Sequence, residues 1–432
     1  MGYPFIWDAI YSLSVLHFAV GSIIRSSIVQ TRWMNTGFVF AVAAFWTFIL
    51  LNKVEFDPVH YQTVDGKYYQ QLAQSFLNGK PMVLDGLTNA KGNSFSPYPP
   101  GFPVLLALIH QLTGFSFSTS AIFLHGLFLL VLLLLFRNSF LGSLLIVAAF
   151  SDTGLELGAN CWSEFSFLAL ILVFGYFIIQ SSGEPKWQDG FILGILGVLC
   201  FMIRYSAVFL ISFLVWKIAF ASSLKLRNNN LKALILFILF YVGWTYWQLH
   251  LTGLPTGGDR YPNEDSIFGL TVDFFRETGN QLALFKNPVG SHFAFFFLAI
   301  IGQISMAIWV VKIRHHKLSN NWTNGLLFSQ LGLFYLMFIS PVRGYFYFAE
   351  SFDCRLLGPG FFLLVMGLGS RISAFQSSFQ PKRWLVIYML LSALFFLPKK
   401  AILEAAQIPA LSNSPAEGSN HYIGAKILSP TH

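Results

Sequence analysis

The sequence predicts an all-α polytopic membrane protein, and two observations carry this prediction. First, 55% of the 432 residues are hydrophobic and only 11% are charged, whereas soluble domains carry roughly 25% charged residues. Second, uncharged apolar runs close to the roughly 20 residues that cross a bilayer recur along the chain. The clearest of them cover residues 33–52, 115–136 and 165–183. We expect about 11 to 13 transmembrane helices on this basis.

The remaining apolar runs are shorter or less regular. They lie at residues 139–151, 190–216, 233–249, 289–311, 324–341, 356–370 and 384–398. The run 100–113 is short for a span, and Arg204 interrupts 190–216, which predicts either one long helix or two short ones. Residues 1–24 lack the pattern of a cleavable signal peptide and look like an interfacial or additional membrane helix.

Charge distribution predicts the orientation. The net charge is +8, but the basic residues fall in short connections, at Arg25 and Arg32 and in 217–232, 312–317 and 371–383, which the positive-inside rule places in the cytoplasm. They indicate orientation, not a nucleic-acid partner. Acidic residues gather in the intervening loops, 251–288 and 342–355, which we place outside.

One conflict remains in this topology. Two full crossings between residues 99 and 136 would put Arg137 outside, although its position after a long apolar run is typical of the cytoplasmic side. A re-entrant segment at 100–113 removes the conflict. The predicted organisation is one transmembrane domain, 1–398, with outer loops 53–99 and 251–288, and a polar tail, 399–432.

The first outer loop contains a predicted amphipathic helix that begins at Asp65. Its apolar residues recur at helical spacing, at Tyr69, Leu72, Ala73, Phe76 and Leu77, so the helix should lie on the membrane surface. Asp65 has two interpretations. It caps the helix through its first free amides, or it is a general base held at the mouth of a substrate site. The segment 96–103, rich in proline, predicts a rigid entrance to the next helix.

Four motifs follow one another along the chain. They are Asp65-Gly66 with Tyr69 and Ala73, Tyr98-Pro99-Pro100-Gly101-Phe102-Pro103, Trp162-Ser163-Glu164-Phe165 and Arg204-Tyr205-Ser206. Their order resembles that in the GT-C superfamily of membrane glycosyltransferases, most closely the group of protein mannosyltransferases and lipid A aminoarabinose transferases. The resemblance covers the layout of roughly residues 34–220 and includes few identities.

The resemblance implies an inverting single displacement. Asp65 would act as the base, and the donor would be a sugar on a polyprenyl phosphate. Tyr69, Tyr98, Glu164 and His60 would contact substrate. Many members of the family carry a second acid next to the first, whereas this chain has Gly66 there, and only Asp57 or His60 lies nearby to replace it.

Cations must stabilise the departing phosphate. Arg204, Arg343 and Arg355 are the candidates, because the guanidinium fork matches phosphate oxygens and a charge at membrane depth is costly unless it is functional or paired. The alternative for each arginine is a structural ion pair with Glu350, Asp353 or Glu164. Glu164 itself is either a substrate ligand or an acid that favours the start of a helix.

Two other functions remain open. A transporter or flippase of lipid-linked sugars would place polar residues in mid-span and show related halves, neither of which is clear here. An O-antigen ligase or polymerase type of enzyme would use the loop 251–288 instead of Asp65. Expected partners are a lipid-linked sugar donor, a glycan, lipid or protein acceptor, and membrane lipids.

The remaining predictions concern metals, cysteines and location. No metal site is predicted, because an isolated Asp65 makes a poor site for a divalent cation without a second carboxylate. A divalent cation stays possible. The three cysteines have no metal-binding spacing, and Cys161 could meet Cys354 if both loops face one compartment. We expect a bacterial inner (plasma) membrane protein with its site outside.

Overall fold

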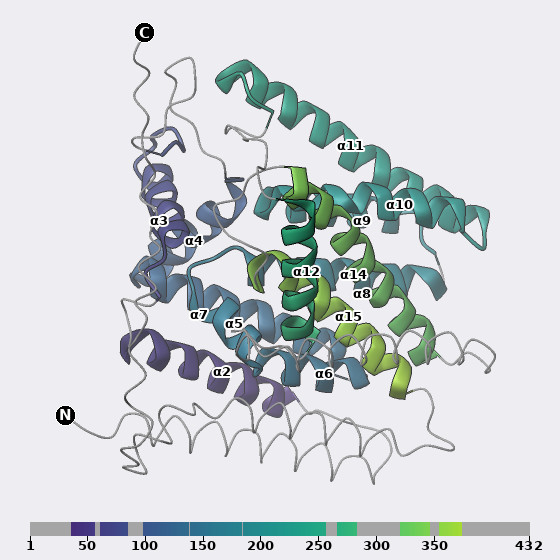
Figure 1. Ribbon diagram of the computed structural model, residues 1–432, viewed down its shortest axis with the longest axis horizontal. Coiled ribbons are helices and arrows are strands. Elements are labelled where there is room, and N and C mark those ends of the chain that lie inside the picture. Colours follow the sequence, from purple (N-terminus) through teal and green to yellow (C-terminus); the bar gives the residue numbers. More distant parts are fainter. Residues whose placement is uncertain are drawn as a thin grey trace.

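The computed structural model describes residues 36–56, 61–84, 98–137, 139–183, 185–255, 266–282, 320–345 and 354–373. Within these ranges every regular element is a helix (Figure 1). The described helices that are long and apolar enough to cross a membrane number five, or six if one bent pair forms a single span. The prediction of an all-α polytopic membrane protein is confirmed. The expected spans 289–311 and 384–398, residues 1–24 and the tail 399–432 lie outside the described residues.

The five helices agree with predicted apolar runs. They are α2 (Thr36–Phe56), α5 (Phe117–Phe136), α8 (Glu164–Gly183), α11 (Leu224–Thr252) and α14 (Asn320–Tyr345). α14 packs along its neighbour α15 (Cys354–Ser373), α2 packs on α5, and α11 packs on α9 (Asp189–Ile203). Aromatic and leucine side chains fill the space between them, and Trp46, Phe167 and Tyr335 are fully buried.

One predicted run is broken, and another is followed by a sharply bent second helix. The run 190–216 forms two short helices, α9 and α10 (Phe209–Ala219), joined by the 3-10 turn η1 (Tyr205–Val208). Arg204 stands at the break in an extended conformation. Arg204 therefore adopts a backbone conformation that a continuous helix would not contain. The run 139–151 forms α6 (Phe140–Ala149), which bends by 69° into α7 (Asp152–Ala159).

The first outer loop contains the predicted amphipathic helix as α3 (Val64–Leu77). In Figure 1, α3 stands at one end of the bundle, and the turn between α10 and α11 lies at the opposite end. Tyr69, Leu72 and Ala73 are buried, whereas Phe76 is 40% exposed. The buried face packs on α4 (Gly101–Thr113), so protein covers the face of this helix that the sequence predicted to lie on the membrane surface.

The helix α4 packs beside α3, and contacts at both ends of α5 place α5 relative to them. α4 begins just after Tyr98, whose ring packs on Tyr69 of α3. The next helix, α5, also begins beside α3, because Gln70 donates a hydrogen bond to Ser118. At the other end of α5, Arg137 donates to Thr36 at the start of α2. Tyr98 and Ser118 thus both lie beside α3, and the length of α5 separates Ser118 from Arg137. The side of the membrane on which Arg137 lies stays a prediction.

Gly101 allows α4 to begin against the end of α9. A Cβ at this position would lie 2.5 Å from the Met202 carbonyl oxygen, two residues before Arg204. Gly101→Ala should therefore lower stability by about 1–3 kcal/mol, the usual cost of overpacking a close contact. Unfolding in detergent measures this. Gly243→Ala is the control, because no described residue lies within 4 Å of a Cβ at that position in α11. Equal losses in both variants would contradict the prediction.

The second outer loop is partly helical. α11 continues to Thr252, and residues 267–282 form α12 (Ile267–Leu282), which packs on α15. The described acids of this loop differ in exposure, since Glu277 is 5% exposed while Asp273 is partly exposed. Glu277 accepts a hydrogen bond from the buried Gln281. The sequence presented this region as a connecting loop, but its buried polar residues tie it to the helical bundle.

Candidate functional site

The first turn of α3 positions Asp65, and Thr63 caps this helix. The Thr63 hydroxyl accepts a hydrogen bond from the Gly66 amide at 3.1 Å. The interpretation of Asp65 as the N-cap is therefore wrong, because the helix begins one residue earlier than the periodicity indicated. Asp65 still benefits from the positive end of the helix, and its carboxylate is left to contact other elements.

Two residues distant in sequence bind the Asp65 carboxylate. Tyr98 donates its hydroxyl to Oδ1 at 2.5 Å. Arg355, 290 residues further along the chain in the first turn of α15, forms an ion pair with Oδ2. The Asp65 side chain is 22% exposed and that of Arg355 12% exposed. Asp65 is thus a held carboxylate at the border of the protein interior, with a cation directly beside it.

Glu164 brings a second carboxylate to the same arginine. It lies in the first turn of α8 and is fully buried. Its Oε1 forms ion pairs with Arg204 Nη1 at 2.5 Å and with Arg355 Nε at 3.1 Å. Within the described part of the chain, Oε2 has no hydrogen-bond partner. Both interpretations of Glu164 remain compatible with this position, because it begins a helix and also pairs with two arginines.

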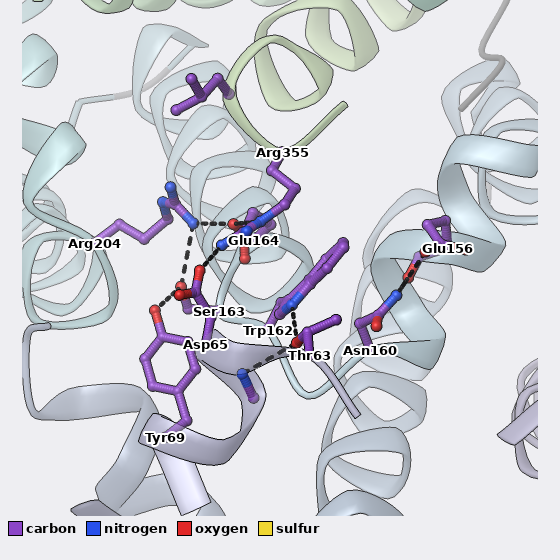
Figure 2. A network of polar contacts seen from close by, with 12 residues as sticks. Thr63, Asp65, Tyr69, Glu156, Asn160, Trp162, Ser163, Glu164, Arg204 and Arg355 are labelled. Atoms are coloured by element: carbon purple, nitrogen blue, oxygen red, sulfur yellow. Dashed lines mark hydrogen bonds and ion pairs between the residues drawn. The ribbon is translucent and has the colours of Figure 1, made fainter. Parts of the chain in front are cut away.

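Asp65, Glu164, Arg204 and Arg355 form one cluster of alternating charges (Figure 2). We call it the ion-pair cluster. Arg355 is shared, since its Nη2 contacts Asp65 and its Nε contacts Glu164. Removing one member of such a buried set leaves an uncompensated charge, which is strongly unfavourable. The arrangement offers a carboxylate for proton transfer and two guanidinium groups for an anion, provided that the anion displaces an existing partner.

Tyrosines form one wall of this cluster. Tyr69 is buried and its hydroxyl lies 2.8 Å from the Ser163 hydroxyl. The Ser163 hydroxyl also accepts from Arg204 at 3.3 Å. Burial, and then the nearby Asp65 carboxylate, raise the pKa of Tyr98 above its ordinary value. Burial and the Glu164 carboxylate likewise raise the pKa of Tyr69. Both phenols therefore stay protonated, and Tyr98 remains a hydrogen-bond donor to Asp65.

The remaining predicted site residues are placed differently. Arg343 is buried near the end of α14, but the described partners of Asp65 and Glu164 are Tyr98, Arg204 and Arg355. His60 lies outside the described residues, as do Asp57, Glu350 and Asp353. For Arg204 and Arg355, the alternative of an ion pair with Glu164 is what the structure shows, although an ion pair at rest is compatible with either role.

Gly66 packs against a neighbouring segment. A Cβ at this position would lie 3.5 Å from the Cys161 Cβ and 3.1 Å from the Thr63 hydroxyl. A larger acidic side chain would therefore meet the cap and Cys161. The second carboxylate near Asp65 comes instead from Glu164, through their shared contact with Arg355.

Sequence reasoning missed Thr63 and Trp162 as parts of the site. The Trp162 indole donates to the Thr63 hydroxyl at 2.7 Å, and the Arg355 guanidinium carbon lies 4.5 Å from the centre of a Trp162 ring. A threonine directly before an amphipathic helix is a standard capping signal and would have identified Thr63. Nothing local in the sequence links Trp162 to either partner.

The described residues contain no group of three His, Cys, Asp or Glu side chains arranged to hold a metal ion. Cys161 and Cys200 are buried free thiols, so the structure does not pair Cys161 with Cys354, which is also buried. Burial raises the pKa of the Cys161 thiol to about 12. Its thiolate is therefore scarce at neutral pH, which makes it a poor nucleophile.

The comparisons with known proteins find matches among solved structures. No family model matches the sequence, and no curated protein matches it. Among solved structures, this chain is similar to the apo form of the Archaeoglobus fulgidus oligosaccharyltransferase, with 11% sequence identity and a TM-score of 0.44. The match covers 87% of this chain and 56% of that one. The chain therefore spans little more than half the length of that protein.

Proposed function

We propose that this protein is a membrane glycosyltransferase that moves a sugar from a polyprenyl-phosphate donor to an acceptor hydroxyl. The observation that carries the proposal is the ion-pair cluster, in which Asp65, from the first outer loop, pairs with Arg355, and Glu164 pairs with both Arg355 and Arg204. A carboxylate and phosphate-binding cations are the two groups that this transfer requires. The motif order Asp65, Tyr98, Glu164, Arg204 described above supports the same chemistry.

In the proposed reaction, Asp65 accepts the proton of the acceptor hydroxyl. The oxygen then forms a bond to the anomeric carbon, and the bond from that carbon to the phosphate oxygen breaks. Polyprenyl phosphate leaves with the electron pair, and the configuration at the anomeric carbon inverts. Arg204 and Arg355 stabilise the departing phosphate, because bidentate guanidinium contacts are strong with phosphate oxygens.

Donor binding must change the resting ion pairs. Arg355 contacts Asp65 through Nη2 and Glu164 through Nε, so a phosphate that replaces Asp65 at Nη2 releases the Asp65 carboxylate. The base is then free only when the donor is in place. Tyr98 holds the released carboxylate through its hydrogen bond to Oδ1. Tyr69, whose hydroxyl lies on Ser163, contributes to the same wall and is proposed to contact the sugar.

The site is proposed to face outside, as the positive-inside rule indicates for α3. The acceptor is a glycan, a lipid or a protein presented at the membrane surface, and the polyprenyl tail remains among the membrane lipids. This orientation makes a cytoplasmic nucleotide sugar an unsuitable donor.

A transfer assay tests the proposal. Purified full-length protein in liposomes is supplied with a radiolabelled polyprenyl-phosphate hexose or pentose and with membrane-extracted acceptors, and the labelled product is separated from the donor. We expect product from the lipid-linked donor and none from the matching nucleotide sugar. Translocation of a fluorescent lipid-linked sugar across the liposome without any transfer would overturn the enzyme and favour a flippase.

A further inference from the structure

Trp162 contacts Arg355 of the ion-pair cluster and also Thr63, the cap of the helix that carries Asp65. Its indole N–H donates at 2.7 Å to the Thr63 hydroxyl, which itself caps the helix that carries Asp65. Its ring supports the Arg355 guanidinium, with a distance of 4.5 Å from the guanidinium carbon to the ring centre. Figure 2 shows Trp162 beside Arg355 and directed at Thr63. The Trp162 side chain therefore contacts both Thr63, which caps the helix that carries Asp65, and Arg355, which pairs with Asp65 and Glu164.

His125 contacts the backbone at Trp162 and at the preceding Gly158. The two ring nitrogens of the buried His125 lie 2.9 Å from the Gly158 carbonyl oxygen and 3.2 Å from the Trp162 carbonyl oxygen. Phe102 and Phe165 pack on the His125 ring. Trp162 is itself only 6% exposed. An aromatic ring fixed at both its backbone and its indole nitrogen has little freedom to move, so it can define where its two neighbours lie.

We infer that Trp162 is a positioning residue for the proposed transfer, which orients Arg355 through its ring and fixes the Asp65-bearing end of α3 through its indole N–H. The two functions are separable. The N–H acts through Thr63 on the position of the base and so affects the chemical step. The ring acts on the guanidinium and so affects donor binding. The inference rests on the proposed function. Its geometric half, that the Trp162 N–H fixes the first turn of α3, can be tested without measuring activity, and its functional half concerns the effects on transfer.

Cys161 reports on the geometric half. It is 2% exposed and lies under Gly66, in the first turn of α3. If the bond from Trp162 to Thr63 fixes this turn, its loss should open Cys161 to a maleimide. Cys200, also fully buried but in α9, reports general unfolding in the same molecule. Mass spectrometry after timed alkylation of the full-length protein measures both thiols.

Four variants separate the contributions. Trp162→Phe keeps a ring under Arg355 and removes the N–H, while Thr63→Val removes the acceptor. Thr63→Ser keeps the hydroxyl and should restore wild-type behaviour. Trp46→Phe is the matched control, because Trp46 is fully buried and its indole N–H donates to the Ala149 carbonyl at 2.8 Å, with no contact to the ion-pair cluster.

In Trp162→Phe and Thr63→Val, we expect the alkylation rate of Cys161 to rise by roughly tenfold, the factor that one lost hydrogen bond produces in a local opening equilibrium. Cys200 should stay protected, and both thiols should stay protected in Thr63→Ser and Trp46→Phe. Unchanged protection of Cys161 in Trp162→Phe overturns the inference. So does a parallel rise for Cys161 and Cys200, which would show a loss of general stability only.

Transfer kinetics test the functional half. Trp162→Phe should lower kcat by roughly tenfold and leave the donor KM within about twofold, because the ring under Arg355 is kept. Trp162→Leu should also raise the donor KM by roughly tenfold, through the lost cation–π contact. Equal effects of both variants on KM would overturn the separation. No transfer by the wild type, with Cys161 still opened by Trp162→Phe, would refute the proposed function and retain the geometric inference.

Discussion

Replacement of Asp65 by asparagine is expected to lower the transfer rate by roughly 10²–10⁴-fold, the usual contribution of a general base. Asparagine is nearly isosteric and can still accept the hydrogen bond from Tyr98, but its amide cannot take the acceptor proton. The measurement is the initial rate of label transfer from the polyprenyl-phosphate donor by protein in liposomes. Donor KM should change much less than kcat, because the arginines that bind the phosphate remain.

Asp189→Asn is the matched control for this variant. Asp189 lies in the first turn of α9 and accepts a hydrogen bond from the Lys186 amide, so it is a helix-start carboxylate with no contact to the ion-pair cluster. Its replacement should leave transfer unchanged. Full activity in Asp65→Asn would end the role of Asp65 as the base. Loss of activity in both variants would point to a shared effect on folding.

Replacement of Glu164 by glutamine is expected to destabilise the protein by roughly 3–5 kcal/mol, the cost of leaving a buried charge without its partner. Glu164 is fully buried and pairs with both Arg204 and Arg355. The neutral amide leaves Arg204 without its carboxylate partner among the described residues. Denaturant unfolding in detergent micelles measures the loss, and transfer should fall with it because the cluster loses its geometry.

A double variant distinguishes charge from packing in this prediction. Glu164→Gln combined with Arg204→Gln removes the unmatched cation, while Arg355 keeps its ion pair with Asp65. We expect the double variant to be more stable than Glu164→Gln alone, although its transfer activity should stay low without Arg204. A double variant that is less stable than the single one would show that the Arg204 side chain contributes by packing instead of charge.

The sequence predicted a helix reliably where the run is apolar throughout, because apolar side chains are favourable both in lipid and in the protein interior. The runs 115–136 and 324–341 became α5 and α14, because any unbroken apolar stretch of that length must satisfy its own backbone hydrogen bonds. The helices that contact protein on one side were harder to predict. α4 is too short to assign from its length, and α12 combines buried Glu277 and Gln281 with exposed Phe268, so hydropathy alone did not reveal its packing.

The ion-pair cluster was predicted residue by residue but not as a set. Asp65, Glu164, Arg204 and Arg355 were each singled out, yet Arg343 was ranked equally with the two arginines that lie in the cluster. Sequence patterns report local helix periodicity and the cost of charge in a membrane. They do not report which of the three arginines meets a carboxylate, here one that lies 290 residues away. The cap was misassigned to Asp65 for a related reason, since helix boundaries read from periodicity shift by a residue or two.

The sequence alone determined that this chain is helical and spans a membrane, because hydrophobic transfer depends on composition and on run length. It also determined which few charged residues would be costly unless paired. Only the tertiary structure decided their pairing: α8 brings Glu164, the break after α9 brings Arg204, and α15 brings Arg355 to Asp65. Ion pairs act over a few ångströms, a distance that the packing of helices fixes and that spacing along the chain does not.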